Sequence, residues 1–225
     1  MHNMVRDRLA DLPVSPRCAI LYLYFVTWSQ STLRNGGHMS EALIFVAPGH
    51  EEVEMLTVVD MLRRADIQIQ MVSITDSLTV TSSHNVTLQT DILLKDADFE
   101  EAKILILPGG MPGTLNLKAC EPLCRQLIHF NKEGKTLAAV CAAPSVLGEL
   151  GILAGKKATC FPSFEDKLLD AEYVKAPVVA DDNVITSRGM GTCIEFAAAI
   201  ITALRDEKTA EAIKTKIIYQ DDYSM

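Results

Sequence analysis

The stretch KTLAAVCAAPSVLGELG, residues 135–151, decides the fold class of this chain. It contains a short apolar run, TLAAVC at 136–141, which passes at once into the helix-forming sequence PSVLGEL. A continuous apolar run of this length is typical of a strand that is buried on both faces of a parallel sheet. A strand followed directly by a helix is the repeating unit of such sheets, so the stretch predicts a β-α unit with Cys141 at its turn.

The same strand-then-helix pattern recurs from residue 42 onward. ALIFVA (42–47) and KILILPGG (103–110) are further apolar strands, and residues 51–65 form an amphipathic helix with acids in its first turn and arginines in its last. The remaining expected elements are a more exposed strand at 67–74, two β segments within 78–88, a helix through 120–132, a hairpin at 178–187 and a helix at 193–206. These units predict an α/β fold with a doubly wound, mainly parallel sheet and helices on both faces.

Length, composition and charge limit the class of protein. The 225 residues are 48% apolar and 22% charged, which predicts one globular domain with a substantial core. The net charge of -8 disfavours nucleic acids and anionic membrane surfaces as partners. Six scattered cysteines without a C-x-x-C pair fit reduced thiols in a cytoplasmic protein. Cys120 and Cys124 lie one helical turn apart, but no further ligand has zinc-site spacing, so no metal is expected.

The first 38 residues differ from the rest of the chain. Their apolar run at 18–28 is too short to span a bilayer, and no small-residue cleavage site follows it, which argues against a secretory signal. Gly36 and Gly37 can be encoded by a purine-rich sequence just upstream of Met39, where a bacterial ribosome-binding site lies. We therefore expect residues 1–38 to be an N-terminal extension, untranslated or disordered, and residues 39–225 to be the folded domain. The intact mass of the natively expressed protein tests this expectation.

Cys141 lies where a reactive thiol is expected. A cysteine in an apolar stretch is usually an inert core residue. However, a side chain on a sharp strand-to-helix turn projects above the sheet, and its close neighbours must be small, as the flanking alanines are. The start of the next helix favours the thiolate, so we expect a lowered thiol pKa. The amides of this turn, with those of Gly109 and Gly110, are candidates to hold an oxyanion.

Three features follow predicted parallel strands: PGHEEVE (48–54), PGG (108–110) and Cys141. Ligands of such sheets bind at the carboxyl ends of the strands, so we expect these features to converge on one pocket. An acid beside a thiolate tends to keep a proton, because two like charges titrate as a coupled pair. Glu51, Glu52 and Glu54 all begin the helix after the first strand, and spacing alone does not choose among them.

None of the five histidines is placed as a base for the thiol. His2 and His38 lie in the first segment, His129 lies in a helix, and His84 lies in a turn. The sequence HEEVE at His50 lacks the second histidine of a zinc motif. Ordinary surface positions are therefore expected for His2, His38, His84 and His129.

Four blocks resemble a known family. In this order and spacing, the chain resembles the ThiJ/PfpI superfamily, in the branch of the DJ-one and YajL proteins, from about Met39 to the C-terminus. The blocks are GHEEVEMLTVVDMLRRA (49–65), LPGGMPGTLNL (107–117), AAVCAAPSVLGELGIL (138–153) and TSRGMGTCIEFAAAII (186–201). The resemblance implies a flavodoxin-like fold, similar to class I glutamine amidotransferases, and a homodimer.

The resemblance also assigns the residues of the site. Cys141 corresponds to the family's reactive, easily oxidised cysteine. Glu54 corresponds to the protonated glutamate that contacts it, which selects among the three glutamates. Gly109, Gly110 and the amide of Ala142 correspond to the oxyanion-binding turn.

Four further positions concern the surroundings of the site. Arg64 and Arg188 correspond to basic positions associated with the dimer and the pocket. Phe161 stands where the DJ-one branch has a histidine, and Met190 replaces the proline of its SRGPGT motif, which affects one pocket wall. The protease-like branch has a histidine directly after the cysteine, where this chain has Ala142, so a Cys-His hydrolase is disfavoured.

The resemblance implies a cofactor-independent cysteine enzyme. Its substrates would be 2-oxoaldehydes such as methylglyoxal and glyoxal, or their early glycation adducts, and its product a hydroxy acid, as in a glyoxalase or deglycase. The alternative is an oxidative-stress sensor or chaperone that uses reversible oxidation of Cys141 without turnover. Both functions use the same residues, so the motifs do not separate them. A cytoplasmic location is expected, with no nucleic-acid or membrane partner.

Overall fold

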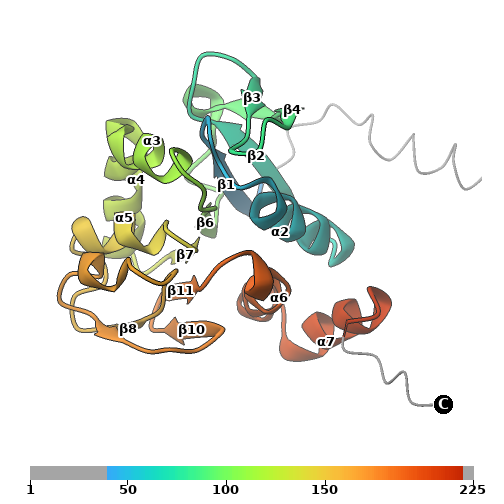
Figure 1. Cartoon of the computed structure of the whole chain (residues 1–225). Coiled ribbons are helices and arrows are strands. Elements are labelled where there is room, and N and C mark those ends of the chain that lie inside the picture. The colour runs from blue at the N-terminus through green and yellow to red at the C-terminus, as the bar shows by residue number, and fades with distance from the viewer. Residues whose placement is uncertain (1–39, 220–225) are drawn as a thin grey trace, which may run out of the picture. The chain divides into compact units, whose positions relative to one another are not determined.

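A seven-stranded sheet forms the centre of the computed structural model, which describes residues 40–219 (Figure 1). The strand order is β10-β11-β7-β6-β1-β2-β5, and every neighbouring pair is parallel except β10 with β11. The strands are β1 (Ala42–Val46), β2 (Ile69–Ser73), β5 (Ile92–Leu93), β6 (Ile104–Leu107), β7 (Thr136–Val140), β10 (Val178–Asp181) and β11 (Val184–Ser187). The expectation for residues 1–38 lies outside the described residues.

Helices cover both faces of the sheet (Figure 1). One face carries α2 (Glu52–Arg64), α6 (Cys193–Leu204) and α7 (Glu207–Lys216). The other carries α3 (Gly113–Ala119), α4 (Glu121–Lys132) and α5 (Pro144–Glu149). Residues 40–219 also contain two small two-stranded sheets, β3 (Thr79–Thr81) with β4 (Thr87–Gln89) and β8 (Lys157–Ala158) with β9 (Glu172–Tyr173). Three short 3₁₀ helices lie in the same part of the chain: η2 (Leu94–Asp96), η3 (Glu165–Lys167) and η4 (Met190–Thr192).

Alternation along the central strands builds two hydrophobic cores. In β1, Ala42, Ile44 and Val46 pack on the α2 and α6 side, whereas Leu43 and Phe45 pack on the opposite side. All of these side chains are fully buried, because successive residues of a strand point to opposite faces and both faces are covered. This is why the strand is apolar at every position instead of at alternate ones. The predicted α/β fold with a doubly wound, mainly parallel sheet is confirmed.

Most of the expected elements are present within a few residues of the predicted bounds, including the antiparallel hairpin of β10 and β11. Two helices were missed. α7 buries only Ala210 and Ile213, so its sequence shows little apolar periodicity, and α3 begins at Gly113 and is only seven residues long. β5, β8 and β9 have two residues each, too few for a periodic pattern. No helix within residues 40–219 is long and apolar enough to cross a membrane.

Candidate active site

Cys141 lies on a strained turn between β7 and α5. Its φ of 65° is in the left-handed region, which non-glycine residues rarely occupy. The turn is held because the Cys141 amide donates to the carbonyl oxygen of Ser187 at 3.0 Å, and the Ala143 amide donates to that of Val140 at 3.0 Å. The thiol is only partly buried. These features are those of a nucleophile placed on a sharp strand-to-helix turn.

Glu54 is the acid that meets this thiol. It lies in the first turn of α2, is 1% exposed, and forms a hydrogen bond with the Cys141 side chain. Its Oε2 also accepts from the Gly109 amide at 2.9 Å, and the Met190 amide donates to the same carboxyl group. The loops that follow β1, β6, β7 and β11, which are neighbours in the sheet, thus meet at one point. The expected convergence is found.

Burial sets the protonation of Glu54. It raises the pKa of this carboxyl from 4.5 to about 7, because the charged form loses its hydration. Hydrogen bonds from Cys141 and the Gly109 amide oppose this rise, and the negative charge of Glu51 adds to it. A carboxyl with a pKa near 7 can both accept and return a proton at neutral pH.

The lowered pKa expected for the thiol is not found. Burial, the charge of Glu54 and the hydrogen bond to Glu54 raise the pKa of Cys141 to about 12, while the amides of Ala142 and Gly110 act in the opposite direction. The helix after the cysteine is only six residues long, so its dipole does not outweigh these effects. The first proton to leave the pair near pH 7 is therefore that of Glu54, and the thiol remains hydrogen-bonded to the resulting carboxylate.

The two glycines of the turn after β6, Gly109 and Gly110, have different roles. A side chain at Gly109 would place its Cβ 2.6 Å from the Cβ of Cys141 and 2.7 Å from Oε2 of Glu54, so only glycine fits. Because its amide already donates to Glu54, Gly109 positions the acid and is not a free oxyanion donor, contrary to expectation. The amides of Gly110 and Ala142 contact the sulfur, and their role as oxyanion donors stays a prediction.

The two arginines lie in different places. Arg188 follows β11, directly after the carbonyl that holds Cys141, and donates to the hydroxyl of Tyr173 at 2.7 Å. Arg64 is ten residues beyond Glu54 on α2, which is about 15 Å along a helix, and its partner is Asp60 at 2.6 Å. Arg64 therefore does not reach the site, and a role for it at a dimer interface stays a prediction.

Phe161 and Met190, the two positions that differ from the family's sequence pattern, contribute main-chain groups to the site. Phe161 donates its amide to the carbonyl oxygen of Cys141 at 2.8 Å, and Met190 donates to Glu54. Their side chains are 46% and 57% exposed. The Phe161 ring would lie 3.4 Å from a Cβ at Gly189, which places it beside the site. Residue type carries no signal for these amides, so sequence reasoning missed them.

His50 does not take part in the thiol's chemistry. It is fully buried, and its Nδ1 donates to the carbonyl oxygen of Ala47 at 2.9 Å. Burial lowers the pKa of the ring, so the imidazole is neutral. His50 therefore holds the loop after β1, whereas Glu54 of the same HEEVE sequence meets the thiol.

A comparison with protein families identifies this arrangement. The model of the DJ-1/PfpI family matches residues 40–203. The chain belongs to this family. It is 38% identical over 162 residues to Protein DJ-1 homolog B of Arabidopsis thaliana, covering 72% of this chain but 37% of that protein. This DJ-1/PfpI chain thus spans about two fifths of the length of such curated relatives.

Other DJ-1 proteins match along nearly their whole length. A Caenorhabditis elegans relative named glutathione-independent glyoxalase DJR-1.2 is 34% identical over 177 residues, which are 77% of this chain and 94% of that protein. The solved structure of oxidized Toxoplasma gondii DJ-1 has a TM-score of 0.77 and 32% identity, covering 80% of this chain and 98% of that one. The resemblance and the flavodoxin-like DJ-1/PfpI fold are both confirmed.

Proposed function

We propose that this protein is a cofactor-independent enzyme that converts 2-oxoaldehydes such as methylglyoxal, or their early glycation adducts, to hydroxy acids. The observation that carries the proposal is the Cys141 thiol hydrogen-bonded to a buried Glu54 whose pKa is about 7. A relative at 34% identity is named a glutathione-independent glyoxalase, which supports the same chemistry. The chain supplies its own thiol in place of glutathione.

In the first step, Sγ of Cys141 attacks the aldehyde carbon while the Glu54 carboxylate takes the thiol proton. This transfer removes the need for a free thiolate, which the raised thiol pKa disfavours. The carbonyl oxygen becomes the oxyanion of a hemithioacetal. The Gly110 and Ala142 amides, which contact the sulfur, are near enough to stabilise that charge.

Glu54 then returns the thiol proton to the hemithioacetal oxygen and is a carboxylate again. In the second step, this carboxylate takes the proton from the former aldehyde carbon and delivers it to the neighbouring carbon, while the hydroxyl proton of the first carbon passes to the oxygen of the second. The first carbon is oxidised to a thioester and the second is reduced to an alcohol, so no external oxidant or reductant is needed. Water then hydrolyses the thioester, which frees Cys141 and releases the hydroxy acid. For methylglyoxal, the overall reaction converts one molecule of the aldehyde and one molecule of water to one molecule of lactate. A single acid-base group with a pKa near 7 can serve each transfer.

The second candidate is an oxidation sensor without turnover. A similar solved structure is described as oxidized, and Cys141 is partly exposed, which supports this alternative. The raised thiol pKa counts against it, because peroxides react with the thiolate and not with the thiol. An attack on an aldehyde does not require a preformed thiolate, because a neighbouring base can take the thiol proton during the attack.

The reduced protein tests the proposal. We expect the fully reduced chain to consume methylglyoxal without glutathione and to produce an equal amount of lactate. Chromatography of both compounds measures this conversion. A glycated peptide as substrate separates deglycase from glyoxalase activity. If the reduced protein leaves all of these compounds unchanged, the enzyme is excluded and the sensor remains.

We also propose that the protein works as a cytoplasmic homodimer. Val53 and Leu56 on α2, and Val86 before β4, are each more than two fifths exposed, and such apolar side chains are typical of an interface. We expect light scattering to give twice the mass of the chain. A Leu56→Glu variant should give the single mass, because a buried charge opposes association. A wild-type monomer at all concentrations would contradict the dimer.

A further inference from the structure

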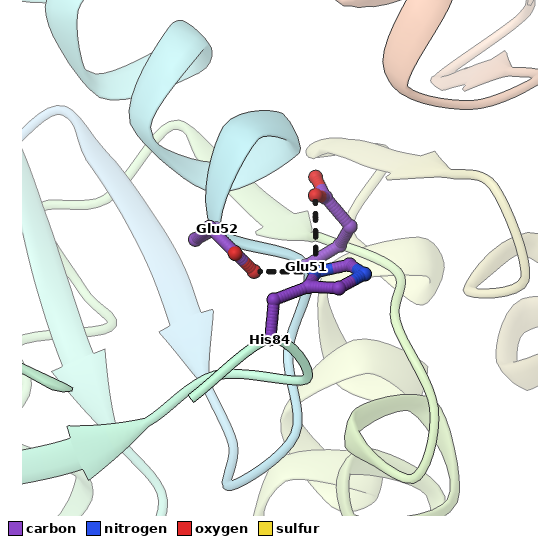
Figure 2. Close-up of side chains that lie close together, drawn as sticks. All are labelled: Glu51, Glu52 and His84. Atoms are coloured by element: carbon purple, nitrogen blue, oxygen red, sulfur yellow. Dashed lines mark hydrogen bonds and ion pairs between the residues drawn. The ribbon is translucent and has the colours of Figure 1, made fainter. Parts of the chain in front are cut away.

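We propose that Glu51, Glu52 and His84 bind a divalent transition-metal ion such as Zn²⁺ beside the Cys141–Glu54 pair (Figure 2). The three side chains come from two segments more than thirty residues apart, the start of α2 and the turn between β3 and β4. This site goes beyond the proposed aldehyde chemistry, which uses none of the three side chains.

The ligand atoms already lie close to one another. Nδ1 of His84 is 3.2 Å from Oε2 of Glu52 and 4.0 Å from Oε1 of Glu51. One ligand atom from each of the three side chains lies within 4.8 Å of the other two. In a tetrahedral zinc site with bonds of about 2.0 to 2.1 Å, ligand atoms are about 3.3 Å apart. Small side-chain rotations therefore bring the three atoms to coordinating positions, with one position left for water.

Both segments are held in place by further hydrogen bonds. Oε2 of Glu51 accepts from the Glu54 amide at 2.6 Å, which leaves Oε1 facing the histidine. The Ser83 amide donates to the carbonyl oxygen of His50 at 2.8 Å and fixes the β3–β4 turn against the start of α2. The Ser82 hydroxyl contacts the carboxyl group of Glu52. Partners of this kind orient metal ligands and strengthen binding.

The charges of Glu51 and Glu52 also favour a bound cation. The side chains of Glu51 and Glu52 are only 12% exposed, yet neither has an ion pair with a lysine or arginine within residues 40–219. Glu41, by contrast, is paired with both Arg205 and Lys103. The positive end of α2 repels a cation, but it amounts to only about half an elementary charge, which two carboxylates exceed. A mixed imidazole and carboxylate set suits Zn²⁺ and related ions.

Calorimetric titration of the full-length, reduced protein with Zn²⁺ tests the site. We expect a one-to-one binding step that His84→Ala weakens by at least about tenfold, since even outer partners of metal ligands contribute about 10- to 100-fold. Glu52→Gln should weaken it similarly. His84 is mostly exposed, so its alanine variant should fold normally. The matched control is His129→Ala on α4, which removes a histidine that has a single carboxylate neighbour, Glu133 at 3.3 Å.

Three outcomes would overturn the site: no binding step, equal affinity in His84→Ala and wild type, or an affinity that His129→Ala lowers as much. Zinc held by the cysteines would give the second of these, because His84→Ala leaves every thiol in place. A parallel titration of Cys141→Ser should match the wild type. Binding is measured without any aldehyde, so its failure leaves the proposed enzyme untouched, and the failure of the enzyme leaves the metal site untouched.

Discussion

We expect Cys141→Ser to lower the proposed methylglyoxal consumption by at least about 10³-fold, because the enzyme would lose its nucleophile. A serine hydroxyl ionises far less readily than a thiol, and Glu54 with a pKa of about 7 is too weak a base to remove its proton. The oxygen is nearly isosteric with the sulfur, so the hydrogen bond to Glu54 and the fold should persist. The decrease of the aldehyde with time measures the effect.

A second cysteine provides the control. Cys124 lies on α4 and its thiol donates to the carbonyl oxygen of Lys118 at 3.3 Å, on the other side of the sheet from Glu54. Cys124→Ser should keep the wild-type rate. If Cys141→Ser keeps it too, the thiol is not the nucleophile and the proposed mechanism is wrong.

Glu54→Gln should lower the same rate by about 10²- to 10⁴-fold, the usual contribution of a general acid-base group. Glutamine keeps the shape of the side chain but neither accepts the thiol proton nor moves one between the two carbons. Asp60→Asn is the control, because Asp60 lies on the same helix, is exposed, and pairs with Arg64 away from the thiol. A Glu54→Gln variant as fast as Asp60→Asn would contradict the role of Glu54.

The pH dependence of stability tests the protonation of Glu54 without any substrate. Below pH 4.5 the carboxyl is protonated in both the folded and the unfolded chain. Between pH 4.5 and about 7 the unfolded chain loses this proton while the folded protein keeps it. The free energy of unfolding should therefore fall as pH rises through this range, by about 3 kcal/mol in total from this group.

Urea unfolding at several pH values measures this contribution as the difference between wild type and Glu54→Gln. The variant has no ionisable group at this position, so its curve should lack that part of the fall. If the two curves are parallel between pH 4.5 and 7, Glu54 ionises as in water and its pKa is not raised. The comparison cancels the other carboxyl groups, which are the same in both proteins.

The strands and the turn with Cys141 could be predicted because their signals are local. LAAV (137–140) is apolar at every position, which only a strand covered on both faces requires, and Cys141 follows it directly. Glu54 was chosen by family resemblance, since Glu51 and Glu52 fit the start of the helix equally well. The structure gives the physical difference: Glu51 caps α2 with its side chain, whereas Glu54 is buried against the thiol.

The sequence did not predict the properties of groups whose surroundings come from distant segments of the chain. The thiol pKa was predicted in the wrong direction, because the short helix after Cys141 is visible in the sequence while the burial of the thiol against Glu54 is not. The engaged amide of Gly109 and the contribution of the Met190 amide were missed for the same reason. His84 looked like an ordinary turn residue until the β3–β4 turn was placed against Glu52.

The sequence by itself determined the order of the long central strands and most helices, the strand-to-helix turn that carries Cys141, and the family to which the chain belongs. These follow from apolar periodicity and from residues that are neighbours along the chain. Only the tertiary structure showed the physical reason why Glu54 meets the thiol, which amides are already engaged, and which way the proton equilibrium lies. Burial, main-chain hydrogen bonds and charge-charge distances arise between residues far apart in the sequence, where no local pattern records them.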